Sequence, residues 1–383
     1  MKIVLVGAGG YGSGYVKRLL IPQDPQVVLE GIVDPYFSSC ATKNEIEAAG
    51  IPVYETMDGF YAEHGADLAV ICTPPFLHRE QSICALRNGS YVLCEKPVAP
   101  TVTEANAMAQ AEEEYGKWIA IGYQWSFSEA IRELKKDILA ERLGNAVFLK
   151  TIISWPRNRA YYARGGGWGG KMFWNGAPLL DSVVSNACAH YLHNMLFLLG
   201  DRMNRSARVT ELSGDCFRAN AIENFDTCSL KLRTEQGAEL YFLASHAARK
   251  ALNPEFEYVF ERATVTFSED NGSLIRASFA DGSEKIYGDP FADSFEKLRA
   301  CIAAIRNGEA PICTVRTATP HTEVIQQIWK ELPIVTVPAE MIQENPTLDG
   351  IYVEGLFESM LEAYTDRKLL SQVDSTLFGN GVK

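Results

Sequence analysis

The chain has 383 residues, of which 47% are hydrophobic and 22% charged, and its formal net charge is −12 at pH 7. This length is enough for two domains at roughly 100–200 residues each, and the composition is that of a globular protein with a sizeable core. The acidic balance argues against nucleic acid or an anionic membrane as partner, because either needs a basic face. No apolar run approaches the roughly 18–20 residues of a membrane span, and the N-terminus does not have the pattern of a signal peptide.

The first 122 residues alternate short apolar runs with helical segments. The predicted strands are Ile3–Val6, Val27–Val33, Leu68–Thr73, Tyr91–Cys94 and Trp118–Gly122, and the predicted helices are Tyr11–Leu20, His78–Asn88 and Thr103–Tyr115. Short runs rich in valine and isoleucine are typical of buried parallel strands. Their alternation with helices predicts an N-terminal α/β domain over residues 1–122, with the doubly wound parallel sheet of a Rossmann fold.

The remaining residues, 123–383, have a different pattern. The predicted elements are a helix at Ser128–Leu143, a strand at Ala146–Ser154, an irregular loop at Pro156–Pro178, a helix at Ser185–Leu199, β runs over 207–287, and helices at 292–307 and 319–332. Consecutive strands separated by turn signals such as Asn-Gly predict an open, mainly antiparallel sheet in an α+β domain. No role is predicted for residues 333–383.

The nine cysteines are scattered and form no C-x-x-C pair. Cys72, Cys84, Cys94 and Cys188 lie in apolar segments, where cysteine is commonly a small core residue. A chain with this cysteine usage is typical of a reducing compartment, so we expect a cytoplasmic protein.

A glycine-rich turn joins the first predicted strand to the first helix. Residues 7–12 read G-A-G-G-Y-G and fit the pattern G-x-G-x-x-G. Glycines there allow a tight turn and let the backbone approach a pyrophosphate at the helix N-terminus. Asp34 ends the second strand, where a carboxylate binds ribose hydroxyls and repels a 2′-phosphate, which favours NAD over NADP. The predicted cofactor-binding residues here are Gly7, Gly9, Gly10, Tyr11, Gly12 and Asp34.

Two further segments follow the fourth and fifth strands. Residues 72–78 read C-T-P-P-F-L-H, and residues 95–97 read E-K-P. Ligands of open α/β sheets bind beyond the carboxyl ends of the strands, so both segments should face the cofactor. This adds Thr73, Pro74, His78, Glu95 and Lys96 to the predicted cofactor-binding residues.

Together with residues 122–127, which read G-Y-Q-W-S-F, these motifs resemble the glucose–fructose oxidoreductase/inositol dehydrogenase/MocA family. The resemblance covers most of the first 200 residues, in the family's order, and places Gln124 with the cofactor-binding residues. It implies a Rossmann domain followed by an α/β domain with an open antiparallel sheet. It also implies NAD(P)-dependent oxidation or reduction of sugars and cyclitols by homodimers or homotetramers that assemble through that sheet.

The resemblance also implies catalytic residues. Lys96 takes the place of the lysine near the nicotinamide and the reacting hydroxyl, and His190, ten residues before Gly200, takes the place of the family histidine. The residue four before His190 is Asn186, where the family has aspartate. A neutral amide can orient a ring but cannot support an imidazolium, so we expect a neutral His190 and proton transfer by Lys96. Whether Asp181 replaces the missing acid is left open.

The loop at 155–174 is rich in aromatic residues and arginine. Aromatic faces stack on sugar rings and arginines pair with carboxylates, so this loop is predicted to bind substrate, with interface packing as the alternative. The predicted substrate-binding residues are Lys96, Tyr123, Arg157, Tyr161, Trp168 and His190. His190 and His193 form an H-x-x-H pair, but no third ligand is evident at a suitable spacing, so no metal is predicted.

The sequence therefore predicts an NAD-dependent oxidoreductase that moves a hydride to or from a hydroxyl-bearing carbon of a sugar, sugar acid or cyclitol. Two alternatives stay open. The first is an enzyme of the same fold that retains NAD and cleaves glycosidic bonds, and the second is a regulator that senses NAD without turnover.

Overall fold

The computed structural model describes residues 1–375, which form two compact units. The first unit comprises Met1–Tyr123 together with Phe295–Thr319, and the second comprises Gln124–Ser294 and residues 320–375. This division differs from the expected one at residue 122, because a segment from late in the sequence belongs to the first unit.

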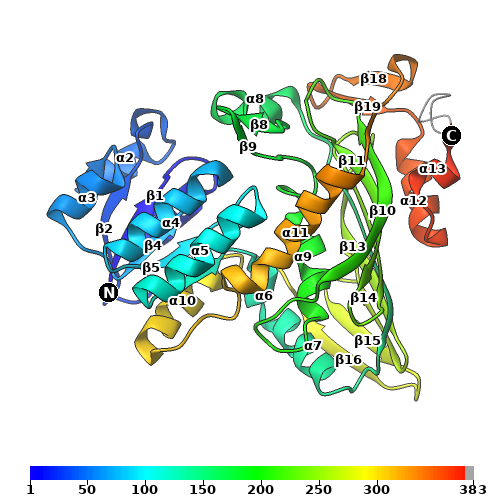
Figure 1. The fold of residues 1–383 in the computed structure, drawn as a ribbon, viewed down its shortest axis with the longest axis horizontal. Coiled ribbons are helices and arrows are strands. Elements are labelled where there is room, and N and C mark those ends of the chain that lie inside the picture. Colours follow the sequence, from blue (N-terminus) through cyan, green and yellow to red (C-terminus); the bar gives the residue numbers. More distant parts are fainter. Residues whose placement is uncertain (376–383) are drawn as a thin grey trace. The chain divides into compact units, whose positions relative to one another are not determined.

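The first unit is built on a six-stranded parallel sheet, coloured blue to cyan in Figure 1. Its strands are β1 (Lys2–Val6), β2 (Val28–Val33), β3 (Val53–Tyr54), β4 (Leu68–Ile71), β5 (Tyr91–Cys94) and β6 (Ile119–Ile121). The helices of the unit are α1 (Gly12–Leu20), α2 (Lys43–Ala48), α3 (Met57–Glu63), α4 (His78–Arg87), α5 (Val102–Tyr115) and α10 (Glu296–Asn307). The order β3-β2-β1-β4-β5-β6 reverses between β1 and β4, which confirms the predicted Rossmann sheet.

Local signals set the bounds of α5, which begins one residue before the predicted start. The Oγ1 atom of Thr101 accepts a hydrogen bond from the Glu104 amide at 3.3 Å and so caps the first turn. The helix ends at Gly116, whose φ of 64° lies in the left-handed region that glycine adopts without steric cost.

The segment Phe295–Thr319 is held to the first unit by specific contacts. The indole of Trp118 donates to the Glu309 carbonyl at 3.0 Å, and the Ile121 amide donates to the Cys313 carbonyl at 2.8 Å. The ring of Phe295 lies so close to α1 that a Cβ on Gly14 would come within 2.6 Å of it. These contacts satisfy edge groups of β6 and explain why the segment belongs to the first unit.

The second unit contains a nine-stranded sheet in the order β16-β15-β14-β13-β7-β12-β11-β10-β17. Its strands are β7 (Ala146–Ser154), β10 (Val209–Arg218), β11 (Thr227–Thr234), β12 (Glu239–Ser245), β13 (Leu252–Phe260), β14 (Ala263–Phe267), β15 (Ile275–Phe279), β16 (Glu284–Gly288) and β17 (Ile334–Thr336). The pairings are antiparallel except β7 with β12 and β10 with β17, which are parallel. The prediction of an open, mainly antiparallel sheet is confirmed.

The helices of the second unit are α6 (Gln124–Phe127), α7 (Glu129–Leu139), α8 (Arg159–Gly167), α9 (Ala189–Leu198), most of α11 (Val315–Glu331), α12 (Leu356–Asp366) and α13 (Leu370–Val373). Two predictions were wrong in detail. The segment expected to be irregular, Pro156–Pro178, contains α8 and the two-stranded pairing of β8 (Phe173–Trp174) with β9 (Ala177–Pro178). The helix expected from Ser185 begins only at Ala189, because residues 183–188 form turns.

Residues 334–373 extend one edge of this sheet and cover one of its faces. The strand β17 extends the edge at β10, β18 (Ile342–Asn345) pairs with β19 (Gly350–Val353), and α12 packs on β7 and β12. The buried cluster beneath comprises Ile152, Phe217, Leu243, Ala247, Ala248, Val337, Val353, Leu356, Met360, Ala363 and Leu370. In Figure 1, α12 and α13 lie on the opposite face of the sheet from α9 and α11.

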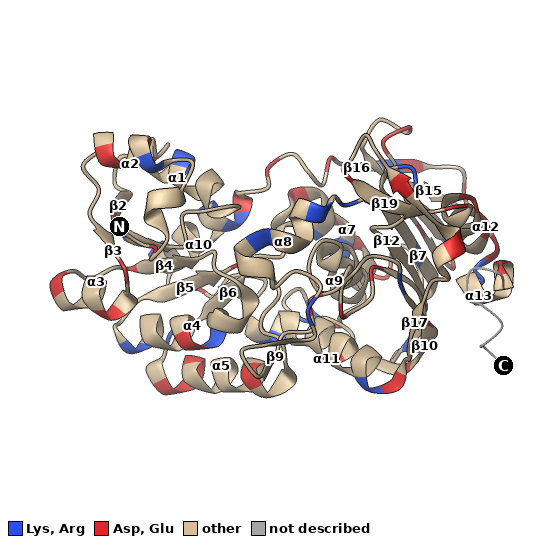
Figure 2. Cartoon of the chain, turned by 90° about the horizontal axis from the view of Figure 1, so that it is seen from above, with Lys and Arg blue, Asp and Glu red and all other residues tan. Residues whose placement is uncertain are grey.

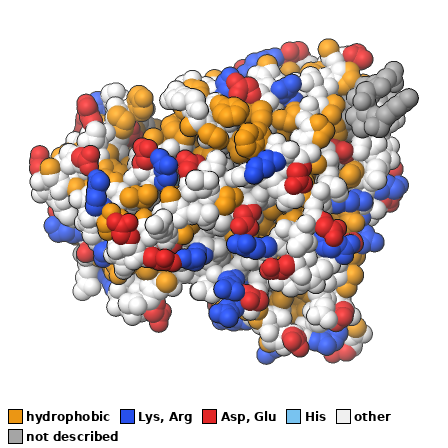
Figure 3. Space-filling view, viewed as in Figure 1, with side chains coloured by type: hydrophobic (Ala, Val, Ile, Leu, Met, Phe, Trp, Pro, Cys, Tyr) orange, Lys and Arg blue, Asp and Glu red, His pale blue; other side chains and the backbone are white. Residues whose placement is uncertain are grey.

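The surface carries charges of both signs. Lysine and arginine are interspersed with aspartate and glutamate along the ribbon in Figure 2 and over the face drawn in Figure 3. Within residues 1–375, no helix is both long and apolar enough to cross a membrane.

One carboxyl group near the end of α5 predicts a pH-dependent stability. Burial raises the pKa of Glu112 to about 7, although its Oε1 atom accepts a hydrogen bond from the Ile119 amide at 2.7 Å. The folded protein then holds a proton that the unfolded chain releases at its ordinary carboxyl pKa. The contribution of Glu112 to the free energy of unfolding is therefore complete at low pH and is lost as the pH rises through about 7.

We expect Glu112→Gln to raise the melting temperature at pH 8 and to change it little at pH 4, because glutamine keeps the acceptor for Ile119 without the buried charge. Differential scanning calorimetry at both pH values measures this. The control is Glu114→Gln, which removes an exposed charge from the same helix. Equal effects of Glu112→Gln at the two pH values would contradict the assignment.

Candidate functional site

The glycine-rich turn between β1 and α1 has two glycines that the protein itself requires. The φ of Gly7 is 87°, and its amide donates to the Val33 carbonyl at 2.9 Å. A Cβ on Gly12 would lie only 2.0 Å from the Gly7 carbonyl oxygen. Side chains at these two positions would therefore disrupt the turn.

Gly9 is different, because the protein leaves room there. Its φ is outside the left-handed region, and the nearest atom to a Cβ built on it is Cys40 Sγ at 4.0 Å. At Gly10, whose φ is 52°, nothing lies within 4 Å of such an atom. A glycine at position 9, where the fold would tolerate a side chain, indicates that something outside the chain approaches the backbone. The open turn before the N-terminus of α1 fits a pyrophosphate.

Asp34 lies beside this turn at the end of β2 and is 8% exposed. One carboxylate oxygen accepts from the Ala8 amide and the other from the Tyr36 amide, both at 2.8 Å. Burial and the adjacent carboxylate raise the pKa of the Cys40 thiol to about 11, so this cysteine remains protonated near neutral pH. The turn thus fixes the carboxylate where an NAD-binding Rossmann fold has its ribose-binding acid.

Tyr11, the one large side chain of the turn, is 46% exposed and stacks on Phe295, with ring centroids 5.5 Å apart and an interplanar angle of 4°. Its hydroxyl accepts from Lys297 Nζ at 3.2 Å. Burial raises the pKa of Tyr11 and outweighs the opposing effect of Lys297. The turn is therefore braced by α10 and the residue before it.

Glu95 was predicted to contact the cofactor, but the structure places it in a buried ion pair. Its Oε1 atom accepts from Lys297 Nζ at 2.5 Å and from the Tyr15 hydroxyl at 2.8 Å. A Cβ on Gly122 would lie 2.8 Å from the other carboxylate oxygen. Burial disfavours the charge on Lys297, but the Glu95 carboxylate more than compensates and holds the pKa of Lys297 above its ordinary value.

His78 was predicted to bind the cofactor, but its ring is completely buried. Nδ1 is 2.8 Å from the Pro97 carbonyl oxygen and Nε2 is 2.9 Å from that of Thr73. The ring thus ties the loop after β4 to the loop after β5, and burial lowers its pKa. His78 therefore positions the loop that carries Lys96, which is itself half-buried.

The other residues predicted to bind cofactor or substrate near the first unit differ in their contacts and burial. The Thr73 hydroxyl donates to Gln81 at 2.5 Å, and Pro74 precedes the short turn η2 (Pro75–Leu77). Tyr123 has no exposed surface, so its burial does not support the predicted contact with substrate. Gln124 is half-buried and is the first residue of the second unit.

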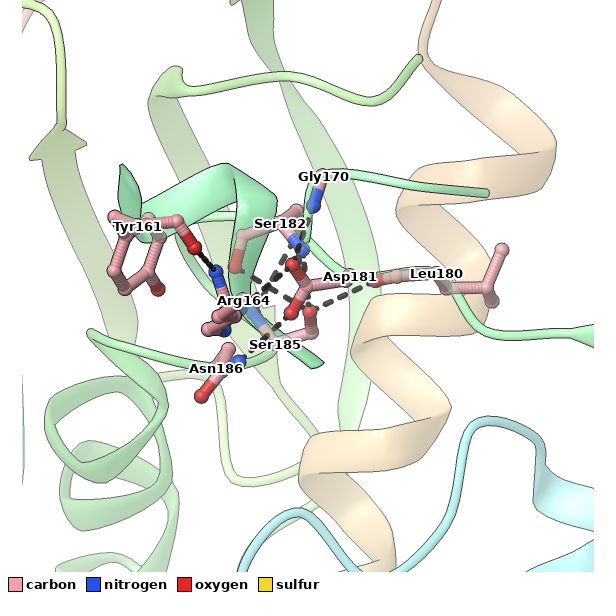
Figure 4. A network of polar contacts seen from close by, with 8 residues as sticks. All are labelled: Tyr161, Arg164, Gly170, Leu180, Asp181, Ser182, Ser185 and Asn186. Atoms are coloured by element: carbon pink, nitrogen blue, oxygen red, sulfur yellow. Dashed lines mark hydrogen bonds and ion pairs between the residues drawn. The ribbon is translucent and has the colours of Figure 1, made fainter. Parts of the chain in front are cut away.

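A polar cluster in the second unit is centred on Asp181, which is 5% exposed (Figure 4). One carboxylate oxygen accepts from the Gly170 amide at 2.6 Å and from Arg164 at 3.0 Å, and the other accepts from Asn186 Nδ2 at 2.8 Å. The preceding residue, Leu180, has a φ of 55°, which is uncommon for a residue with a bulky side chain. Its carbonyl accepts from the Ser185 hydroxyl at 2.8 Å, which holds the turn in this conformation.

The structure therefore brings a carboxylate into contact with Asn186, the residue that stands where the family resemblance implies an aspartate. Asn186 donates its amide to Asp181, and Figure 4 shows its side-chain oxygen directed away from that carboxylate. Asn186 lies in the turn just before α9, and His190 follows in the first turn of that helix, where it is half-buried. His193 is buried, with Nε2 3.0 Å from the Ser126 hydroxyl, and burial holds its pKa well below the ordinary value.

The aromatic loop places its three arginines in different surroundings. Arg164 lies over the rings of Tyr161 and Trp168, with Cζ 3.9 and 4.2 Å from the centroids. Arg157 lies over the Tyr161 ring, with its Cζ atom 4.7 Å from the ring centroid. Arg159 instead points to the surface, where it pairs with Glu344 at 2.6 Å and Asp349 at 2.9 Å. Trp168 is 8% exposed, so it packs within the loop.

Sequence reasoning missed Lys297 altogether. Its signal was present, since Lys297, Cys301 and Ala304 have the i, i+4, i+7 spacing of one helix face and the other two are apolar. A lysine on the buried face of an amphipathic helix indicates a buried partner of opposite charge.

The fold and the open turn define a two-domain protein with a Rossmann unit suited to a dinucleotide. Residues 1–123 match the model of the oxidoreductase family with an NAD-binding Rossmann fold. This match agrees with the resemblance of the chain's motifs to the glucose–fructose oxidoreductase/inositol dehydrogenase/MocA family.

Relatives agree with this assignment. The chain is 30% identical to the rhizopine catabolism protein MocA of Rhizobium meliloti over 43% of this chain and 51% of that protein. It is 30% identical to an inositol 2-dehydrogenase of Renibacterium salmoninarum over 39% of this chain and 44% of that protein. The chain thus spans about half the length of these curated relatives.

Solved structures share the whole fold. The WlbA dehydrogenase from Bordetella pertussis, solved in complex with NADH and UDP-GlcNAcA, has a TM-score of 0.70 to this chain at 22% identity. The likeness covers 86% of this chain and 95% of that one. Both units therefore share their fold with the units of that solved structure.

The buried pair of Glu95 and Lys297 predicts a non-additive effect on stability. Removing one partner leaves an uncompensated buried charge, which costs about 3–5 kcal/mol, whereas removing both charges costs much less. We expect Lys297→Met to destabilise the first unit by about this amount, and Glu95→Gln/Lys297→Met to recover a large part of the loss. Denaturant unfolding of the two single variants and the double variant measures the coupling. Strict additivity would show that the two groups do not interact.

Proposed function

We propose that this protein is an NAD-dependent oxidoreductase that transfers a hydride between the cofactor and a hydroxyl-bearing carbon of a sugar, sugar acid or cyclitol. The observation that carries the proposal is the glycine-rich turn of an NAD-binding family, open at Gly9 and flanked by the fixed Asp34 carboxylate. Relatives named inositol 2-dehydrogenase and glucose-6-phosphate 3-dehydrogenase support the substrate class.

The preference for NAD rests on Asp34. Its two oxygens are held by backbone amides at 2.8 Å, so the carboxylate stays beside the turn. A fixed negative charge there accepts hydrogen bonds from ribose hydroxyls and repels the 2′-phosphate of NADP.

The proposed roles of the chain's own residues follow from their chemistry. The nicotinamide, when bound, supplies the acceptor or donor for the hydride. Lys96, as a neutral amine, takes the proton of the substrate hydroxyl while the carbon loses its hydride, which leaves a carbonyl. Asn186 is held by Asp181 and offers its oxygen as an acceptor, and His190 orients the substrate as a neutral ring.

The proposal extends to location and assembly. All nine cysteines lie within the described residues and none forms a disulfide, which supports a reducing, cytoplasmic environment. Assembly into a homodimer or homotetramer stays a prediction from the family resemblance. Because α12 covers the sheet over β7 and β12, an interface on that face would have to include the helix or lie over other strands.

A spectrophotometric screen at 340 nm tests the function. Purified protein is supplied with NAD or NADP and with inositols, aldoses, sugar acids and simple glycosides. We expect NADH to form with one substrate class and NADPH to form more slowly, because of Asp34. Cleavage of a glycoside without NADH accumulation would instead support the glycosidase-like alternative, and NAD binding without any turnover would support the regulator.

Lys96→Ala tests the proton transfer. Loss of a general acid–base group lowers kcat by roughly 10²–10⁴-fold, and we expect NAD affinity to change little. Steady-state kinetics gives kcat, and quenching of protein fluorescence gives the dissociation constant of NAD. Lys43→Ala, which removes an exposed lysine of the same unit, is the control. Full activity of Lys96→Ala would reject this role.

A further inference from the structure

His246 follows directly after β12 and is only 1% exposed. Its Nδ1 atom lies 2.8 Å from the carbonyl oxygen of Trp155. A carbonyl can only accept, so Nδ1 carries the proton and Nε2 of the neutral ring is an acceptor. Burial, and then the charge of Arg157, lower the pKa of His246 to about 3, which keeps the ring neutral at physiological pH.

Three buried polar atoms of this region have no hydrogen-bond partner among the described residues. They are Nε2 of His246, Nε of Arg157 and the hydroxyl oxygen of Tyr162, and the first two concern the ring and the guanidinium. Buried polar atoms in native proteins are nearly always hydrogen-bonded. Nε2 of His246 can therefore accept a hydrogen bond from a ligand, and Nε of Arg157 can donate one to a ligand.

The two side chains share one aromatic neighbour. The Tyr161 ring centroid is 4.7 Å from Arg157 Cζ and 5.5 Å from the centroid of the His246 ring. The backbones are also joined, since the Arg157 amide donates to the His246 carbonyl at 3.1 Å. The acceptor and the cation therefore lie beside the same ring.

Arg157 also differs from the other two arginines of the loop in that it forms no ion pair with a carboxylate of the described residues. Arg164 is paired with Asp181, and Arg159 with Glu344 and Asp349, whereas no ion pair involves Arg157 among residues 1–375. A half-buried guanidinium without a carboxylate partner is suited to an anionic ligand.

We infer that His246 and Arg157 form a binding subsite for the carboxylate end of a hydroxy acid. Arg157 pairs with the carboxylate, and Nε2 of His246 accepts a hydrogen bond from the neighbouring hydroxyl. The inference rests on the proposed function in that it narrows the substrate class to sugar acids. A neutral sugar would satisfy His246 but leave Arg157 unpaired, whereas a hydroxy acid offers an anion to Arg157 and a donor to His246.

Thermal-shift assays on the full chain test the subsite without turnover. The probes are D-gluconate and D-galacturonate, each compared with its neutral counterpart, D-glucitol or D-galactose. We expect the acids to raise the melting temperature of the wild-type protein more than the neutral compounds do. Arg157→Met should abolish this difference. Arg159→Met, which removes the same charge from the same loop, should retain it.

Two substitutions of His246 separate its ligand contact from its structural bond. An asparagine amide can replace Nδ1 as the donor to Trp155 but provides no acceptor at the position of Nε2. We expect His246→Asn to keep the unliganded melting temperature near that of the wild type and to weaken binding of the acid about 5–100-fold, as for loss of a buried hydrogen bond. His246→Gln, which reaches the Nε2 position, should recover part of that affinity.

The outcomes distinguish this inference from the proposed function. Stabilisation by acids that depends on Arg157 and His246 supports the subsite even if the 340 nm screen shows no turnover, which would reject only the oxidoreductase activity. Turnover of neutral sugars with no preference for acids, or an acid preference that survives both Arg157→Met and His246→Asn, would overturn the subsite and leave the oxidoreductase proposal standing.

Discussion

The arrangement of the first unit depends on the buried ion pair between Glu95 and Lys297. The Nζ atom of Lys297 reaches the end of β5, the Tyr11 hydroxyl in the glycine-rich turn and, at 3.3 Å, the Gly122 carbonyl after β6. A buried ammonium is costly unless its donors are satisfied, so these three segments are held in a narrow range of positions. The same contact explains why residues far along the chain belong to the Rossmann unit.

The second unit also contains a buried charge, the carboxylate of Asp181. This carboxylate accepts hydrogen bonds from a backbone amide, an arginine and an asparagine, and these contacts fix the loop before α9. The family resemblance made Asn186 a departure, because the expected acid was missing from the helix. The structure shows a carboxylate supplied from five residues earlier and bonded to that asparagine. Whether this carboxylate takes the role of the family acid stays a prediction, and the Asn186 amide is the group that links the two positions.

In the loop that carries Lys96 and in the aromatic loop at 155–174, residues with a structural role position the candidate functional residues. His78 bridges two backbone carbonyls and so sets the loop of Lys96, and Arg164 pairs with Asp181 and so leaves Arg157 as the cation without a carboxylate partner. Several residues that the sequence suggested as ligand-binding residues therefore have a structural role. The residues that remain for ligands are those whose polar atoms the protein does not already satisfy.

The sequence by itself determined the Rossmann unit, the mainly antiparallel sheet and the glycine-rich turn, and it carried the family resemblance of the NAD-binding domain. These follow from local patterns: apolar periodicity, glycine spacing and an acid at the end of β2. Only the tertiary structure decided that Phe295–Thr319 joins the first unit, that Glu95 and His78 are buried, and that Asp181 meets Asn186. It also decided the partners of His246, because which polar atoms are left without a partner depends on contacts between segments distant in sequence, and no local pattern encodes those contacts.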